Sequence, residues 1–273
     1  TGTIYLYLAS PAEFLITDPQ GRKLGKDPIT NIIYNEIPNA SYTQEGPIVS
    51  SDTPLDASQI HRTKVIYIPT PIDGNYDIRV IGTDTGEYTL TALTYDNQGN
   101  SHIQTKTGNA EANLTIDYSL NFTPDTPENI VIQPTDTEAP IVSYTQLNSE
   151  YILNSSSVIF NFSAQDSGTG VFKVSATIDE QPLSNNAVFD FNDIGEHFII
   201  IEAEDFVGNK KTETITYKVI YNFSGFLPPV KADGSGIYKS GRTLPVKFQL
   251  KDANGNFIST AIAKLYVAKI QNG

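Results

Sequence analysis

The chain has 273 residues, of which 31 are acidic and 18 basic, giving a formal net charge of −13. Such an acidic surface repels phosphate backbones, so nucleic acid is not expected as a partner. There is no cysteine, which excludes disulfides, thiolate metal sites and cysteine nucleophiles. Hydrophobic residues make up 39% of the chain, but no stretch is long enough to span a membrane.

Short apolar runs, broken by Gly, Pro, Asn and Asp, recur along the whole chain, and none keeps the period of an amphipathic helix. The length suits two or three domains. We therefore predict an all-β protein made of tandem antiparallel β-sandwich domains of immunoglobulin-like type.

Residues 1–122 are predicted to form the first domain, a β-sandwich or jelly-roll-like accessory domain. Its strand-like runs include "TIYLYLA", "KVIYIP", "GNYDIRVIG", "GEYTLTALTYD" and "NLTIDYSL". The stretch "DPQG" (18–21) is a turn, with Pro at the position whose φ the turn requires.

Tyr5 and Tyr7 share one face of the first strand, because side chains alternate along a strand. Carbohydrate-binding modules present planar aromatic side chains on a sheet face, and this chain has 15 Tyr but no Trp. Two interpretations are open. The pair forms a small platform, or it packs against the second sheet of the sandwich, and we favour the second because Tyr is often partly buried.

Residues 123–138 contain three prolines and several acids and are predicted to be a semi-rigid linker. The alternative is that "NIVIQP" within this segment is the last strand of the first domain. Residues 139–220 carry short strands at regular spacing, which favours an immunoglobulin-like domain, although without the Cys–Trp–Cys core of antibody domains.

Asp166 and Asp205 raise the main question of the sequence, because each takes the last inward position of an apolar strand, in "FNFSAQDSGTGV" and "IIIEAEDFVGNK". Two bare carboxylates at one end of a sandwich repel each other. They are either turn locks, each accepting backbone N–H groups of its own turn, or ligands of Ca²⁺. We favour turn locks, since a calcium loop normally gathers more acids. The candidate metal ligands are Asp166, Asp205 and Asn209, with Glu204 nearby.

Residues 221–273 are predicted to form an incomplete third β domain. In the strand 243–250, four apolar residues point one way, and Pro245 marks an edge because it has no N–H for a ladder. These four residues are Leu244, Val246, Phe248 and Leu250. We expect this segment to dock on the immunoglobulin-like domain, or residues 244–250 to pair with another chain through the open edge.

Three parts of the chain resemble known bacterial modules. "NFSGFLPPV" and "SGRTLPVKFQLKD" resemble the domain named for its Pro-x-Lys-Phe motif, here Pro245 to Phe248, which implies a secreted or surface protein. "DTEAPIVSY", "SAQDSGTGV" and "AEDFVGNK" resemble bacterial immunoglobulin-like repeats. "SPAEFLITDPQGRKLG" and "GNYDIRVIGTDTGEYTLTAL" look like accessory β-sandwiches that follow catalytic or von Willebrand-type domains. None of these modules implies a catalytic motif here.

The three histidines, His61, His102 and His197, have no ligand spacing, and no Gly-x-Ser-x-Gly elbow occurs. We therefore expect a non-catalytic spacer, structural or adhesion segment of an extracellular or cell-surface protein, with a surface protein or a glycan as partner and no cofactor unless Ca²⁺ binds. The alternatives are an accessory region of a secreted hydrolase whose catalytic domain precedes Thr1, or a carbohydrate-binding module. The absence of Met suggests a piece of a longer protein.

Overall fold

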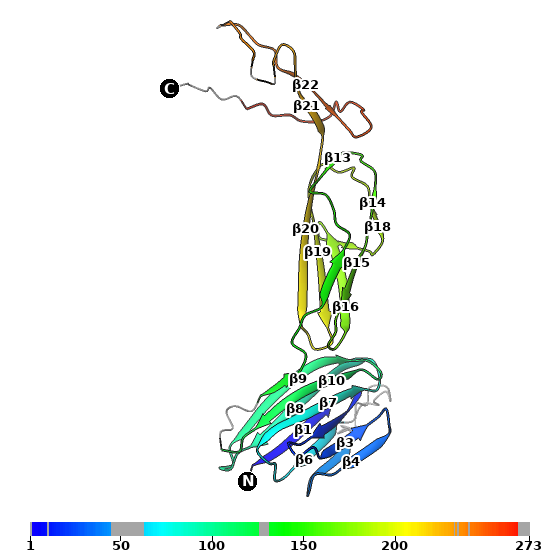
Figure 1. Ribbon diagram of the computed structural model, residues 1–273, viewed down its shortest axis with the longest axis vertical. Coiled ribbons are helices and arrows are strands. Elements are labelled where there is room, and N and C mark those ends of the chain that lie inside the picture. The colour runs from blue at the N-terminus through cyan, green and yellow to red at the C-terminus, as the bar shows by residue number, and fades with distance from the viewer. Residues whose placement is uncertain are drawn as a thin grey trace, which may run out of the picture. The chain divides into compact units, whose positions relative to one another are not determined.

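The computed structural model describes residues 2–9, 11–44, 63–125 and 131–266, apart from 232, 234 and 240. These residues form strands and turns and contain no helix, so the predicted all-β class is confirmed (Figure 1). In this part of the chain, no helix is therefore available to cross a membrane. His61 lies outside the described residues.

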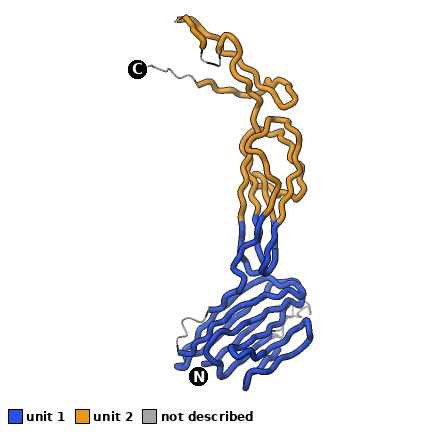
Figure 2. Tube along the Cα trace, in the orientation of Figure 1, with its two compact units in different colours: residues 1–142, 164–174, 202–211 blue, residues 143–163, 175–201, 212–273 orange. Residues whose placement is uncertain are grey.

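The chain divides into two compact units, and Figure 2 colours them separately. The first comprises residues 1–142, 164–174 and 202–211, and the second residues 143–163, 175–201 and 212–273. The turns that contain Asp166 and Asp205 belong to the first unit. The predicted immunoglobulin-like segment, 139–220, is therefore shared between the two units.

The first sandwich consists of two antiparallel sheets (Figure 1). One has the order β5-β6-β1-β8-β9, namely Ser41–Gln44, Lys64–Ile68, Thr3–Ala9, Gly86–Tyr95 and Ser101–Ala110. The other has the order β11-β10-β7-β2-β3-β4, namely Ile132–Pro134, Thr115–Phe122, Gly74–Gly82, Ala12–Thr17, Lys23–Asp27 and Ile32–Asn35.

The core of this sandwich comes from one side-chain row of each strand. On β1 the buried row is Ile4, Leu6 and Leu8, all fully inaccessible to solvent. The expectation that Tyr5 and Tyr7 pack against the second sheet is therefore wrong, because they occupy the opposite, partly exposed row. The aliphatic row fills the core without burying hydroxyl groups, which would each need a partner there.

Buried tyrosines in the same core satisfy their hydroxyl groups locally. The Tyr88 and Tyr118 hydroxyls hydrogen-bond to each other in the interior. Gly108 lies opposite Tyr88 on β9, where a Cβ atom would come within 2.5 Å of the Tyr88 hydroxyl. A side chain at position 108 would therefore displace this pair.

The predicted linker, 123–138, contains a strand. Ile132–Pro134 forms β11 and pairs antiparallel with β10, from Tyr118↔Pro134 to Leu120↔Ile132, and Ile132 is fully buried. This part of the segment is thus an edge strand of the first sandwich. Pro134, which has no N–H, is tolerated at such an edge.

The second sandwich has a five-stranded sheet of order β13-β20-β19-β16-β17. These strands are Glu150–Ile152, Lys210–Ile220, Gly195–Asp205, Val171–Ile178 and Gln181–Leu183. Two short pairs complete it, β12-β15 (Ile141–Tyr144 and Phe162–Gln165) and β14-β18 (Val158–Phe160 and Ala187–Phe189). The strands that precede Asp166 and end at Asp205, β15 and β19, thus belong to different sheets.

The C-terminal segment forms a two-stranded antiparallel sheet, β21 (Asn222–Leu227) with β22 (Lys247–Lys251). β22 is shorter than the predicted strand 243–250, since it begins after Pro245. Phe223, Phe226 and Phe248 pack edge to face on it and remain well exposed. Pairing of its edge with another chain stays a prediction.

Two hydrogen bonds join the loop after β22 to the loop after β13. Asn154 Nδ2 donates to Asp252 Oδ2 at 3.0 Å, and the Ala253 N–H donates to the Leu153 carbonyl at 2.8 Å. Within the second unit, the C-terminal segment thus contacts the immunoglobulin-like segment. Of the two outcomes expected from the sequence, this contact fits docking.

Candidate functional site

Three carboxylates meet at one place in the first unit. One oxygen each of Asp136, Asp166 and Asp205 lies within 4.8 Å of the other two. The sequence indicated that Asp166 and Asp205 would meet, but it did not indicate Asp136. The only local signal for Asp136 is its place in "PTDTEAP", an acid-rich stretch just before β12.

Asp205 is fully buried and is held by its own turn. Its Oδ1 accepts the backbone N–H groups of Val207 at 2.9 Å and Asn209 at 2.8 Å. Its Oδ2 accepts from Asn209 Nδ2 at 2.7 Å. Both carboxylate oxygens therefore have donors from within four residues.

Asp166 and Asp136 are held in a related way. Asp166 Oδ1 accepts the N–H groups of Gly168 at 2.9 Å and Gly170 at 2.8 Å. Asp136 Oδ2 accepts the N–H of Thr169 at 2.6 Å and its hydroxyl at 2.8 Å. Asp136 thus ties the edge of the first sandwich to the turn that Asp166 closes.

Asn209, a candidate metal ligand from the sequence, contributes a donor and not an oxygen. Besides its bond to Asp205, its Nδ2 lies 3.3 Å from the Asp136 carbonyl and 3.2 Å from the Glu138 carbonyl. The amide thus faces three oxygen acceptors. Glu204 lies on the opposite, more exposed face of β19, where its carboxylate is 3.5 Å from Lys210 Nζ.

The turn of Asp205 has three close copies elsewhere in the chain. Each has the pattern Asp-x-x-Gly followed by Asn or Arg, and they are "DPQGR" (18–22), "DNQGN" (96–100), "DFVGN" (205–209) and "DANGN" (252–256). In all four, Oδ1 accepts the N–H groups two and four residues ahead, at 2.8–2.9 Å. The fifth residue's side chain binds Oδ2 at 2.7–3.0 Å. We call this arrangement the aspartate lock.

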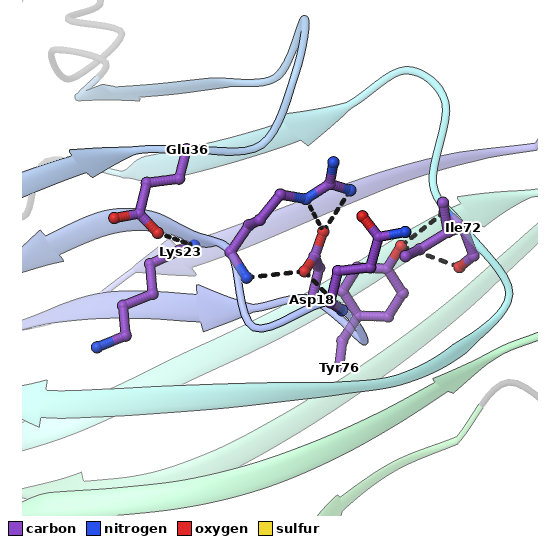
Figure 3. Close-up of polar contacts among 7 residues, drawn as sticks. Asp18, Lys23, Glu36, Ile72 and Tyr76 are labelled. Carbon is purple, nitrogen blue, oxygen red and sulfur yellow. Dashed lines mark hydrogen bonds and ion pairs between the residues drawn. The ribbon is translucent and has the colours of Figure 1, made fainter.

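Figure 3 shows the first lock, with dashed lines from the carboxylate of Asp18 to the donors around it. All four lock aspartates, Asp18, Asp96, Asp205 and Asp252, are buried. Hydrogen bonds from Asn256 and then Asn154 lower the pKa of Asp252. Such bonds to the charged form are what stabilise a carboxylate inside a protein.

The lock glycine is required by the backbone. Gly21, Gly99, Gly208 and Gly255 have φ between 79° and 92°, a region that side chains with a Cβ rarely adopt. Each lock is also closed by a backbone bond from the Asp N–H to the carbonyl four residues ahead, at 2.9–3.1 Å. The turn at Asp166 is a variant, since Gly170 has no side chain to bind its second oxygen.

These bonds give Asp166 and Asp205 the turn-lock role predicted for them. The same geometry occurs at Asp18, Asp96 and Asp252, and in the described part of the chain none of those three belongs to a metal-sized acidic cluster. In these three turns, donors of the chain itself surround the carboxylate. Among the described residues, the carboxylates of Asp136, Asp166 and Asp205 form the acidic group whose spacing could fit a cation.

His197 forms a separate polar contact in the second unit. Its Nδ1 lies 2.7 Å from Asp179 Oδ2, its Nε2 lies 3.1 Å from the Asp193 carbonyl, and its ring stacks on Tyr217. Burial alone would lower the pKa of His197, but the bonds to Asp179 and Asp193 outweigh it and raise the pKa. With oxygen acceptors at both ring nitrogens, the protonated form of this histidine is favoured, and neither nitrogen is free for a substrate.

His102 differs from His197, since its Nε2 is buried and has no hydrogen-bond partner among the described residues. Thr94 is its cross-strand neighbour on β8, and the Thr94 hydroxyl is also buried without a hydrogen-bond partner among the described residues.

A scan of the chain against models of protein families finds no match, and a search among curated proteins finds none either.

Replacing Asp205 by Ala is expected to reduce the free energy of unfolding by about 1–3 kcal/mol, because two partly buried N–H groups lose their acceptor. Asp166→Ala is the matched control and should cost less, since its turn is partly exposed and water can replace the carboxylate. Urea unfolding measures both. Equal unfolding midpoints for Asp205→Ala and the parent chain would show that the lock does not stabilise the fold.

Millimolar Ca²⁺ is expected to leave the melting temperature of the chain unchanged, because a ligand stabilises a protein only by binding the folded state. Here both oxygens of Asp205 are taken by donors, and the Asn209 amide lies beside the cluster. Scanning calorimetry with Ca²⁺, and with Mg²⁺ as the control, measures this. A rise of several degrees that is specific to Ca²⁺ and is lost in Asp136→Asn would instead establish a metal site.

The His197–Asp179 pair predicts a pH-dependent stability. Because the pKa of His197 is raised in the folded state, its contribution is complete below the unfolded value of about 6.5 and is lost as pH rises through the folded pKa. Asp179, whose pKa is lowered, stays charged over this range. Melting temperatures measured upward from pH 5.5 should therefore fall in the parent chain. His197→Gln should remove this fall, and an unchanged pH dependence in that variant would refute the assignment.

Proposed function

We propose that the chain is a non-catalytic, modular segment of a secreted or cell-surface protein, where it serves in spacing, display or adhesion. Chemistry at neutral pH needs a carboxylate, imidazole or hydroxyl that faces substrate with a free lone pair or proton. The proposal rests on how the buried acids of this chain are used.

The buried acids of the described residues are all occupied by structural donors. Four are the lock aspartates, each bonded within its own turn. The fifth, Glu13, accepts from Tyr42 and Gln44 and lies 3.8 Å from Lys26 Nζ. Each of the five carboxylates thus accepts hydrogen bonds from donors of the chain itself. This observation carries the proposal, because a buried acid with a free oxygen is the usual mark of a catalytic carboxylate.

The same features suit a segment that must stay folded outside the cell without disulfides. Locked turns remove flexible loop tips, which are the preferred sites of proteolytic cleavage. Aromatic contacts stabilise the second sandwich, in which Phe160 stacks on Phe189 and Tyr151 on Phe191. Such a module can separate neighbouring domains without catalysing a reaction.

The test is turnover by the purified chain. Chromogenic ester, peptide and glycoside substrates are expected to hydrolyse no faster than in buffer, while limited proteolysis leaves both sandwiches intact. Asp205→Asn serves as the control for contaminating hydrolases, because a contaminant keeps its activity in that preparation. Turnover by the parent chain that a single Ser or Asp substitution abolishes would overturn the proposal.

A further inference from the structure

Four tyrosines gather on the outer face of the five-stranded sheet of the first sandwich. Tyr5 and Tyr7 lie on β1, Tyr67 on β6 and Tyr95 on β8, and each is partly exposed. Tyr5 stands at their centre, with ring centroids 4.7 Å from Tyr67 and 6.3 Å from both Tyr7 and Tyr95. We call this group the tyrosine face.

The strand pairing fixes the tyrosine face in place. Tyr5 is the cross-strand partner of Tyr67, and the Thr3–Tyr95 pair lies one step along the same face of the sheet. β1 is bonded to β6 on one side and β8 on the other, so Tyr5 and Tyr7 project from a central strand. The rings of Tyr5 and Tyr7 are nearly parallel, at 9°. Sites on such rigid strands need little reorganisation to bind a ligand.

The surroundings of the tyrosine face are uncharged. The outward residues beside it on β8 and β9 are Thr91, Leu93, Ile103 and Thr105, and the two Thr hydroxyls lie 3.1 Å apart. Among the described residues of these five strands, Glu87 at the end of β8 is the single charged outward residue. In a chain with 31 acidic and 18 basic residues, these strands therefore offer little charge to attract an anion or a cation.

We propose that the tyrosine face binds a neutral polysaccharide chain. A pyranose ring has a C–H face that packs on aromatic rings, and hydroxyl groups that phenol and threonine hydroxyls can bond. The four tyrosines are partly exposed on a sheet surface, which suits an extended polymer more than a small molecule. A peptide strand would add to a sheet at its edge, through backbone bonds, and not on its face. Charge complementarity excludes nucleic acid, acidic glycans and anionic membranes as the favoured partner.

The inference rests on the proposed function, since it gives an adhesion segment its site and ligand class. The experiment uses the full 273-residue chain and a panel of neutral polysaccharides: a mixed-linkage β-glucan, a xylan, a mannan and soluble starch. Affinity electrophoresis detects binding, and calorimetry measures it. The same incubations are assayed for reducing ends, so loss of binding and the appearance of turnover are scored separately. The first overturns this inference and the second overturns the proposed function.

The parent chain is expected to bind at least one of these polymers. Tyr5→Ala and Tyr67→Ala should weaken binding about tenfold or more, since each removes a stacking ring. Tyr5→Phe should retain most of the affinity and guards against misfolding as the cause, together with melting curves of all variants. The matched control is Tyr34→Ala on β4, a partly exposed tyrosine in the other sheet of the same sandwich, and it should bind like the parent chain.

Three results would overturn the inference. They are no binding of the parent chain to any of the four polymers, an equal loss in Tyr34→Ala and Tyr5→Ala, or a concentration-dependent self-association that Tyr5→Ala abolishes while polymer binding persists. The last result would assign the tyrosine face to a second copy of the chain.

Discussion

The structure depends on how a buried carboxylate satisfies the backbone of a tight turn. When a chain reverses through Asp-x-x-Gly, the glycine takes a left-handed conformation and two N–H groups point into the loop. Asp Oδ1 accepts both, and the Asn or Arg at the fifth position binds the other oxygen. The turn can then be buried, because no polar group in it lacks a partner. Three of the four locks join hairpin strands, at β2–β3, β8–β9 and β19–β20.

Hydrogen bonds also act against the repulsion among the three clustered carboxylates. Two bare charges about 4 Å apart repel by roughly 4 kcal/mol at an effective dielectric of 20. A hydrogen bond to a charged group contributes about 1.5–3 kcal/mol. Asp205 accepts three such bonds and Asp136 accepts three, from Glu138 and Thr169. These donors therefore offset much of the repulsion, and the cluster of acids forms where two adjoining turns each need an acceptor.

The sequence predicted what depends on neighbours along the chain. Alternation identified the inward rows that end at Asp166 and Asp205, and the turn pattern identified their role. The sequence also repeats Asp-x-x-Gly, followed by Asn or Arg, at three further sites. What it could not predict depends on contacts between distant residues. Asp136 reaches Thr169 across 33 positions. β11 pairs with β10, and the sequence predicted this strand only as the alternative to a linker. On β1 both rows were apolar enough for a core, so the pattern alone could not decide which one faced inward.

The inward and outward side-chain rows of β1 have different roles in the first sandwich. Because Ile4, Leu6 and Leu8 complete the core by themselves, the tyrosines of the same strand are not needed to exclude water from it. Stacking across strands contributes about 0.2–1 kcal/mol per pair, which threonine or valine could largely supply at these positions. Fold stability therefore accounts for β-forming residues on the outer row but not for four clustered phenol rings in an uncharged setting. Because the inward row of β1 stabilises the fold, the side chains of its outward row can instead serve to bind a ligand.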